Sequence, residues 1–302
     1  MLRIRMLSGE DVASIPVGEV IDVRAMKQRL NALHGLPNRF RQRLICQGSP
    51  LDDSATLSSP ADLELVLLPH SDATETQVVE LVTAAAKGST TEVETMLRLP
   101  QNPNIVGSQG RSALTAASHE GNVEVLRLLL EAGADKNMQT TDGDTALILA
   151  SAGGRLESVH LLLNAGADKN ACDNDGFTAL AAAAEFNSLS DIVRLLLDAG
   201  ADVNLASKCG TTALMLASQQ GQLETVRLLL DARADLNSAT DDGFTAVMLA
   251  RLFCRWETVT LLQDVGADRI ARKRPQSPDL NTSKRRRGSS ATAGGADGPG
   301  DA

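Results

Sequence analysis

The chain has 302 residues, of which 43% are hydrophobic, and a formal net charge of −9. This length allows two domains with sizeable cores, and five Phe, one Trp and no Tyr leave Leu, Val and Ala to fill them. The N-terminus lacks the apolar core of a secretory signal, and no run of about 18 apolar residues could span a membrane. We therefore expect a protein of the cytoplasm or nucleus with no membrane partner.

Charge is distributed unevenly along the chain. Residues 1–70 are neutral, residues 71–268 carry a net charge of −14 and residues 269–302 carry +5. The acidic middle repels nucleic acid and favours basic protein partners, so only the basic tail could contact nucleic acid. The four cysteines and four histidines lack the spacing of metal ligands. We expect no metal site, no cofactor and reduced thiols.

Residues 1–69 show the pattern of a small α+β module. Residues 1–7 alternate between polar and apolar as a strand does, and Ser8-Gly9 follows as a turn. Asp22 can cap a helix that ends at Gly35-Leu36-Pro37, and two more strands are predicted at 41–46 and 63–68. The order is hairpin, helix, strand, strand.

That order resembles the ubiquitin-like, or β-grasp, fold. The resemblance is carried by Leu7-Ser8-Gly9, the Gly-Leu-Pro helix end, Gln42-Arg43-Leu44-Ile45 and Leu63-Glu64-Leu65-Val66-Leu67. If Leu44 and Leu63 face the core, the two-residue period turns Ile45 and Val66 to solvent. With Leu7, these residues match the patch that ubiquitin-like modules present to ubiquitin-pathway proteins. Scattered surface hydrophobic residues are the alternative. The module ends without a diglycine, so the resemblance implies docking and not conjugation.

A second pattern fills the middle of the chain. A glycine opens Gly-x-[Ser/Thr]-Ala-[Leu/Val] at residues 110, 143, 176, 210 and 243, a spacing of 33 or 34 residues that predicts a solenoid. The first helix of each unit is expected to be capped by Ser112, Thr145, Thr178, Thr212 or Thr245. The second is expected to end at Gly133, Gly166, Gly200 or Gly266 in a left-handed conformation. Arg233 replaces this glycine in the fourth unit.

These units resemble the ankyrin repeat. We expect an all-α solenoid with a degenerate cap at 77–106 and five repeats at 107–268, joined to the first module by a linker at 70–76. In ankyrin stacks, the hairpin tips and the ends of the first helices line the concave binding face. The matching positions here are Arg111, His119, Asp142, Asp144, Phe177, Phe186, Phe244 and Phe253.

The phenylalanines of this set are candidate binding anchors, because exposed aromatic residues with an acidic rim are typical of protein interfaces. The alternative is that they fill space between helices. Trp256 aligns with apolar positions of the other repeats and is expected in the core.

Residues 269–302 are expected to form a disordered basic tail, rich in Pro, Ser, Gly and Arg. Its two basic clusters resemble a bipartite nuclear localisation signal. They are Arg272, Lys273, Arg274 and Lys284, Arg285, Arg286, Arg287. A solvated tail and weak nucleic-acid contact are the alternatives.

The sequence therefore predicts a monomeric, non-catalytic adaptor. Its repeats would bind a protein client, and its ubiquitin-like module would dock on ubiquitin- or proteasome-pathway proteins. A nuclear regulatory protein that binds transcription or chromatin factors, with tail contacts to nucleic acid, is the alternative. We find no paired base and nucleophile, metal cluster or phosphate loop that would indicate an enzyme.

Overall fold

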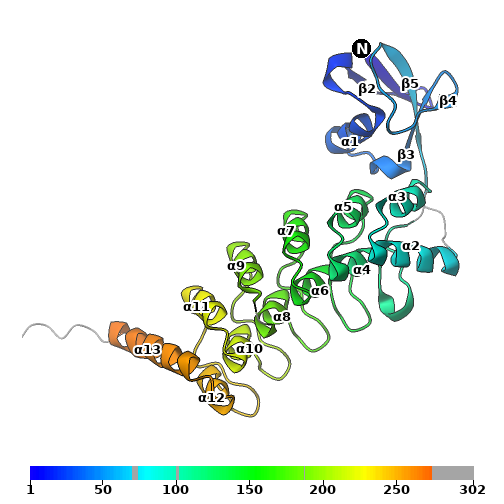
Figure 1. Ribbon diagram of the computed structural model, residues 1–302. Helices are drawn as coiled ribbons and strands as arrows, with labels where there is room; N and C mark the ends of the chain where they lie inside the picture. Colours follow the sequence, from blue (N-terminus) through cyan, green and yellow to red (C-terminus); the bar gives the residue numbers. More distant parts are fainter. Residues whose placement is uncertain (70–73, 100–101, 187, 274–302) are drawn as a thin grey trace, which may run out of the picture.

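The computed structural model describes residues 1–69, 74–99, 102–186 and 188–273, and of residues 267–273 it describes the backbone only. An N-terminal head, residues 1–69, sits on one end of a solenoid of helix pairs (Figure 1). The chain leaves the head through the segment that follows its last strand and enters the first helix pair directly below.

The head is a five-stranded mixed sheet with one helix packed on it. Its strands are β1 (Leu2–Met6), β2 (Asp11–Ile15), β3 (Gln42–Cys46), β4 (Ser49–Pro50) and β5 (Ala61–Leu67), in the order β2-β1-β5-β3-β4. β1 pairs with β5 in parallel, and the other pairs are antiparallel. This arrangement fits the predicted β-grasp.

Helix α1 (Val23–His34) begins and ends as the sequence predicts. The Asp22 side chain accepts a hydrogen bond from the Ala25 amide at 2.7 Å, and Gly35 ends the helix with a φ of 63°. Met26 and Leu30 of α1 are fully buried in the core of the head with residues from alternate strand positions. Two short 3-10 helices, η1 (Val17–Glu19) and η2 (Arg39–Arg41), complete the head.

The solenoid begins with the helix pair α2 (Glu75–Lys87) and α3 (Thr90–Arg98). A short 3-10 turn, η3 (Ser108–Gly110), leads into the five repeats. Their helix pairs are α4 (Ala113–Glu120) and α5 (Val123–Glu131), α6 (Ala146–Ala152) and α7 (Leu156–Asn164), α8 (Ala179–Glu185) and α9 (Ser190–Asp198), α10 (Ala213–Gln220) and α11 (Leu223–Asp231), and α12 (Ala246–Leu252) and α13 (Trp256–Lys273).

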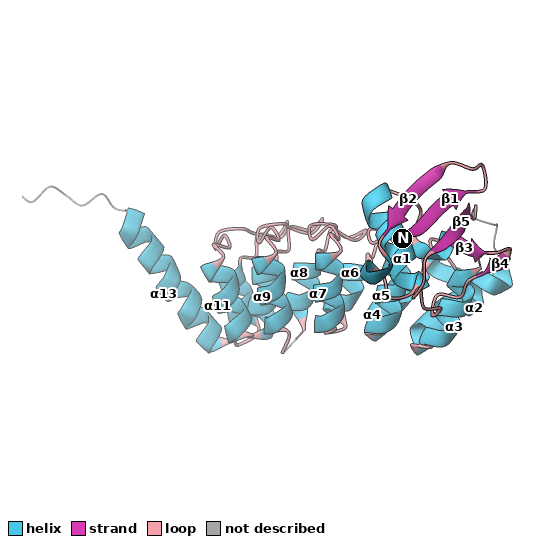
Figure 2. Cartoon of the chain, turned by 90° about the horizontal axis from the view of Figure 1, so that it is seen from above, coloured by secondary structure: helices cyan, strands magenta, loops and turns pink. Residues whose placement is uncertain are grey.

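First helices stack on first helices and second helices on second helices along the whole array. In the view from above, the helices lie side by side and the hairpin loops line one edge (Figure 2). Because alanines recur on the first helices, neighbouring units approach closely and share one continuous core. Phe40 of η2 belongs to this core, so the head contributes an apolar side chain to the solenoid.

The predicted caps of the first helices are confirmed in all five repeats. The side-chain oxygens of Ser112, Thr145, Thr178, Thr212 and Thr245 each accept a hydrogen bond from the backbone amide three residues later. Such a bond satisfies one of the amides that the first turn of a helix leaves without a partner.

The ends of the second helices confirm the prediction at three glycines and correct it at a fourth. Gly133, Gly166 and Gly200 have φ values of 84°, 76° and 79°. Arg233 takes the same conformation at 67°, at a cost of about 1–2 kcal/mol for a residue with a side chain. The prediction for Gly266 is wrong, because α13 continues through it to Lys273. In the inner repeats the left-handed residue turns the chain toward the next hairpin, whereas here the helix continues. Asn187 lies outside the described residues.

Candidate interaction surfaces

The hairpins form a continuous row along one edge of the solenoid. Each hairpin donates a backbone hydrogen bond to the one before it, as the Asn174 amide does to the Asp142 carbonyl at 3.0 Å. The approach is so close that a Cβ on Gly143 would lie 2.4 Å from the Asn174 nitrogen, and the φ of Gly143 is 85°. Glycine is therefore required at this tip for steric as well as conformational reasons.

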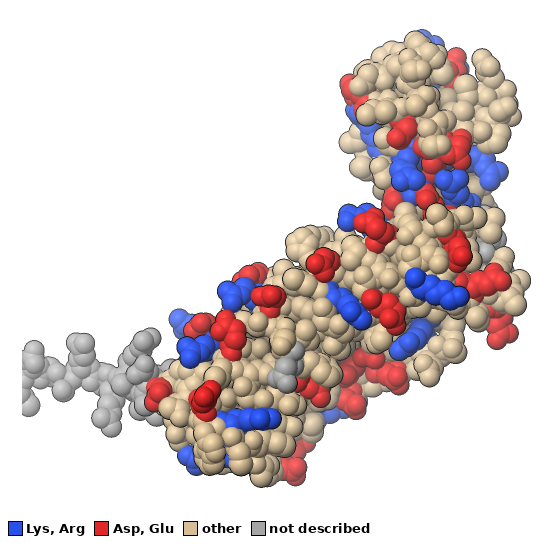
Figure 3. All heavy atoms as spheres, in the orientation of Figure 1, with Lys and Arg blue, Asp and Glu red and all other residues tan. Residues whose placement is uncertain are grey.

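Acidic side chains gather on this row, visible along the lower edge of the solenoid in Figure 3. Asp142 is exposed and Asp144 is half-buried. Burial raises the pKa of Asp144, and the nearby charges of Asp173 and Asp142 raise it further, while the charge of Arg111 acts in the opposite direction. These three carboxylates thus repel one another, and Arg111 offsets that repulsion only in part.

The four phenylalanines do not form one cluster. Phe177 is half-buried on the third hairpin, and Phe186 is 48% exposed at the end of α8. Phe244 and Phe253 both belong to the last repeat, at either end of α12. The other predicted helix-end residue, His119, lies 3.0 Å from the Glu120 carboxylate through its Nδ1.

The prediction that Trp256 lies in the core is wrong. Its side chain is 63% exposed at the start of α13. It shares the exposed end of the solenoid with Phe244, Met248, Leu252 and Phe253, the group that we call the terminal face. The alignment of Trp256 with apolar positions of other repeats was correct. Those positions are themselves only partly covered, because Leu156 is 36% exposed and Val123 and Leu223 are half-buried.

The predicted patch on the head lies on the outer side of the sheet. Ile45 pairs with Glu64 and Arg43 with Val66, so Ile45 and Val66 share the side opposite the buried Leu44. Leu7 follows Met6, which pairs with Leu65 at the end of β1, and lies in the turn beyond that strand. Leu7 is exposed, whereas Ile45 and Val66 are half-buried.

A charged junction between the head and the solenoid was not predicted. Arg39 of η2 is fully buried, and its guanidinium donates to Asp53 of the head at 2.5 Å. The same group donates to Glu131 at the end of α5 at 2.7 Å and to Glu94 of α3 at 3.3 Å. Arg24 also donates to Glu94, at 2.8 Å. These interactions clamp the head onto the first two helix pairs.

Two further contacts close the junction. Arg98 of α3 pairs with Asp52 of the head at 3.0 Å, and the side-chain amide of Asn38 donates to the backbone carbonyl of Ala132 at 2.6 Å. Hydrogen bonds from the Ser54 backbone and hydroxyl, with a contribution from Arg98, lower the pKa of Asp52 to about 2. Burial opposes ionisation of Asp53, but hydrogen bonds and charges from Lys27 and Arg39 outweigh it and lower its pKa.

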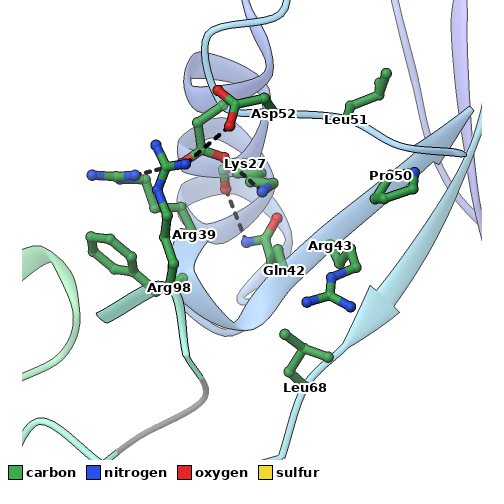
Figure 4. A pocket seen from close by; sticks show the side chains of 11 residues that line it. Lys27, Arg39, Gln42, Arg43, Pro50, Leu51, Asp52, Leu68 and Arg98 are labelled. Atoms are coloured by element: carbon green, nitrogen blue, oxygen red, sulfur yellow. Dashed lines mark hydrogen bonds and ion pairs between the residues drawn. The ribbon is translucent and has the colours of Figure 1, made fainter. Parts of the chain in front are cut away.

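A small hollow of about 140 Å³ opens beside these ion pairs (Figure 4). Gln42 lies at its wall and donates to the carbonyls of Lys27 and Pro37. Both bonds hold the head together, because they tie β3 to α1 and to the segment that follows it. The hollow thus lies beside the junction, and the polar side chains that line it are largely bonded to other groups of the chain.

The basic residues of the tail are only partly described. Arg272 and Lys273 lie in the last turn of α13, beyond the boundary at 268 that the sequence predicts for the repeats. Arg274, Lys284, Arg285, Arg286 and Arg287 lie outside the described residues.

The described residues contain neither a metal-binding cluster nor a membrane-spanning helix. No group of three His, Cys, Asp or Glu side chains there is arranged to hold a metal ion. None of the helices in that part of the chain is both long and apolar enough to cross a membrane. All four cysteines are free, and Cys172, Cys209 and Cys254 are exposed.

A family model described as ankyrin repeats, in three copies, matches the chain in overlapping stretches. These are residues 64–140, 81–173, 132–207 and 180–272. The matches begin in the last strand of the head and continue to the end of α13. No curated protein matches the chain.

Proposed function

Because the chain belongs to the ankyrin-repeat family, whose repeats are general modules for protein–protein interaction, we propose that it is an adaptor without catalytic activity that binds a basic protein client along its hairpins. The observation that carries this proposal is the row of carboxylates on neighbouring hairpins. Burial raises the pKa of Asp144, and repulsion from Asp173 and Asp142 raises it further. A lysine or arginine of a client would relieve that repulsion and gain a charge-assisted hydrogen bond.

Aromatic side chains on the same side would add apolar contact. Phe177 follows the acidic second hairpin by one repeat, and Phe186 ends the first helix of that third repeat. Aromatic residues at the centre of an interface contribute more binding energy than their number suggests. A client with basic and apolar residues in alternation therefore fits this surface best.

The test compares charge-matched variants of the full chain by affinity purification and mass spectrometry. Asp142→Asn with Asp144→Asn removes two charges from the row. Asp198→Asn with Asp231→Asn removes two exposed charges from the ends of second helices. We expect the first pair to lose basic clients and the second to retain them. Retention of the same clients by both pairs would show that the acidic row is not the binding surface.

The head supports a second binding role within the same adaptor, docking on ubiquitin-pathway proteins through Leu7, Ile45 and Val66. Its junction with the solenoid uses α1, η2 and the segment around Asp53, on the other side of the sheet. Titration of the full chain with ubiquitin-binding domains should give saturable binding that Ile45→Ala reduces. Ala13→Ser, on the edge strand β2, is the control. Equal affinities for wild type and Ile45→Ala would rule out the patch.

The basic tail supports a separate proposal, nuclear import through its two clusters. A fluorescent fusion that ends at Asp268 should lose nuclear accumulation relative to the full chain. Equal accumulation of both fusions would remove this role. It would also remove the alternative of a nuclear regulatory protein whose entry depends on the tail.

A further inference from the structure

The terminal face is apolar where a solenoid end is expected to be polar. Terminal repeats of such arrays need a polar outer surface to remain soluble. Here Met248 is 51% exposed and Leu252 is 62% exposed, next to Trp256 and two phenylalanines. No charged side chain separates Met248 from Leu252 along the outer side of α12 except Arg251 at its end.

Equivalent positions in the other repeats show what this surface does elsewhere in the molecule. The position of Met248, third in the first helix, is occupied in the preceding repeats by Thr115, Ile148, Ala181 and Met215, which are between 1% and 4% exposed. Each is covered by the first helix of the next unit, since consecutive first helices are in contact. Met248 is therefore a stacking position that has no partner within the described residues, whereas the positions of Leu252 and Trp256 are exposed or half-buried in the inner repeats as well.

The size of the terminal face fits an interface. Aromatic side chains have roughly 200 Å² each to bury, so the three on this face, each about half exposed, offer about 300 Å². With Met248 and Leu252 the apolar area reaches about 500 Å², at the upper end of what a monomer exposes in one patch. Two such faces in contact would bury about 1,000 Å², the lower limit for a specific interface.

The last repeat differs from the preceding one at a position where consecutive repeats approach each other. At Gly221, one repeat earlier, a Cβ would lie 2.6 Å from the Arg255 Cδ of the following repeat. Cys254 stands at the equivalent position and shares the left-handed conformation, with φ values of 77° for Gly221 and 56° for Cys254. Ser188 takes the same conformation in the third repeat, with a φ of 69°, and the fourth repeat still packs on the third, so a side chain here does not by itself prevent stacking.

The tail of the chain does not match the face. Among residues 274–302, Leu280 is the only large apolar residue, and the rest are mostly charged, polar, Gly, Ala or Pro. A segment of this composition cannot replace the apolar contacts that a stacked repeat makes. The cover must come from another molecule.

Charge along the last repeat indicates which molecule. Asp241 and Asp242 precede α12, whereas Arg251 lies in its last turn. When two copies of α12 pack antiparallel about a two-fold axis, the basic end of each approaches the acidic start of the other. Because both copies use the same surface in such a two-fold contact, the assembly stops at two copies. We infer that the terminal face binds a second copy of this chain, so that the protein is a dimer in place of the monomer expected from the sequence.

Trp256 is the chain's only tryptophan, so its fluorescence reports on the terminal face of the unmodified protein. On dilution over roughly a hundredfold range of concentration, mass action should convert dimer to monomer. Sedimentation velocity should follow the mass, and Trp256 emission should shift to longer wavelength as its ring becomes hydrated. In parallel, alkylation of Cys254 should become faster on dilution, while the exposed Cys172 and Cys209 react at constant rates.

Matched variants locate the contact. Met248→Glu places a charge on the terminal face, whereas Val79→Glu places one on the other end of the solenoid, where Val79 is similarly exposed at 54%. We expect Met248→Glu to be monomeric throughout and Val79→Glu to dimerise as wild type does. A wild-type monomer at every concentration, with constant Trp256 emission, would overturn the inference. So would a Met248→Glu dimer, or loss of the dimer in Val79→Glu.

Discussion

The two ends of the solenoid differ in what covers them. At the N-terminal end, α2 presents polar side chains to solvent, among them Glu75, Glu80 and Lys87, and the head is clamped on the neighbouring helices through Arg39. At the C-terminal end, Met248 and Trp256 stand open. The repeat position of Met248 is core in the middle of the array and surface at its end. Whether a side chain is buried is thus a property of the stack and not of the unit.

The largest expected difference comes from placing the same charge at equivalent positions in the middle and at the C-terminal end of the solenoid. Ile148→Glu should lower the free energy of unfolding by more than about 3 kcal/mol, because it buries a charge without a partner. Met248→Glu occupies the equivalent exposed position and should change it by about 0.5 kcal/mol or less. Urea denaturation followed by circular dichroism, at a protein concentration low enough to keep the chain monomeric, measures both. Similar losses in both variants would mean that Met248 is covered in solution.

The clamp at the N-terminal end depends on a buried cation. Arg39→Met should cost about 3 kcal/mol, because it leaves Asp53 and Glu131 without their shared partner in a buried site. It should also release the head, which small-angle scattering would detect as a larger radius of gyration. Arg43→Met, an exposed arginine on the neighbouring strand, is the control and should change neither quantity. A head that stays fixed in Arg39→Met would show that Phe40 and the remaining ion pairs suffice.

Lowering the pH should weaken the junction between the head and the solenoid and stabilise the hairpin row. Asp52 and Asp53 have lowered pKa values in the folded chain, so their contribution is present above the ordinary value of about 4 and is lost as the pH falls toward the value of about 2 of Asp52. The pKa of Asp144 is raised. The folded chain therefore takes up this proton first, and the hairpin row gains stability as the pH falls through that raised value.

Carboxyl-carbon NMR titration of the full chain would resolve the two effects. Asp144→Asn should abolish the stabilisation in mild acid and leave the loss at lower pH intact. Stability that falls steadily from neutral pH in both proteins would contradict the assignment of Asp144. This is the smallest of the expected effects, because its hairpin is only partly buried.

Local features of the fold were predictable because their causes lie within a few residues. Thr145 caps α6 because a hydroxyl precedes an apolar helix, and Gly133 ends α5 because only glycine takes a left-handed conformation without strain. The alternation that turns Ile45 away from Leu44 depends only on the period of a strand. These predictions needed no knowledge of distant contacts.

The junction could not be predicted in this way. Arg39 meets Glu94 and Glu131 from 55 and 92 residues away in the sequence, and nothing in its own neighbourhood selects those two carboxylates from the many in an acidic chain. Trp256 failed for a related reason. An apolar residue type at the aligned positions does not establish burial there, since the equivalent Leu156 is itself 36% exposed.

The units of this protein are readable in its sequence: a small α+β head, repeats of 33 or 34 residues, their caps and turns, and acidic residues on the hairpins. Each follows from periodicity and local backbone chemistry, which act over a few residues. Only the tertiary structure decided how the units end. It fixed the head on the first repeats through Arg39 and left the last repeat open at Met248 and Trp256. Ion pairs between distant segments and the burial of a stacking surface depend on which pieces meet in space.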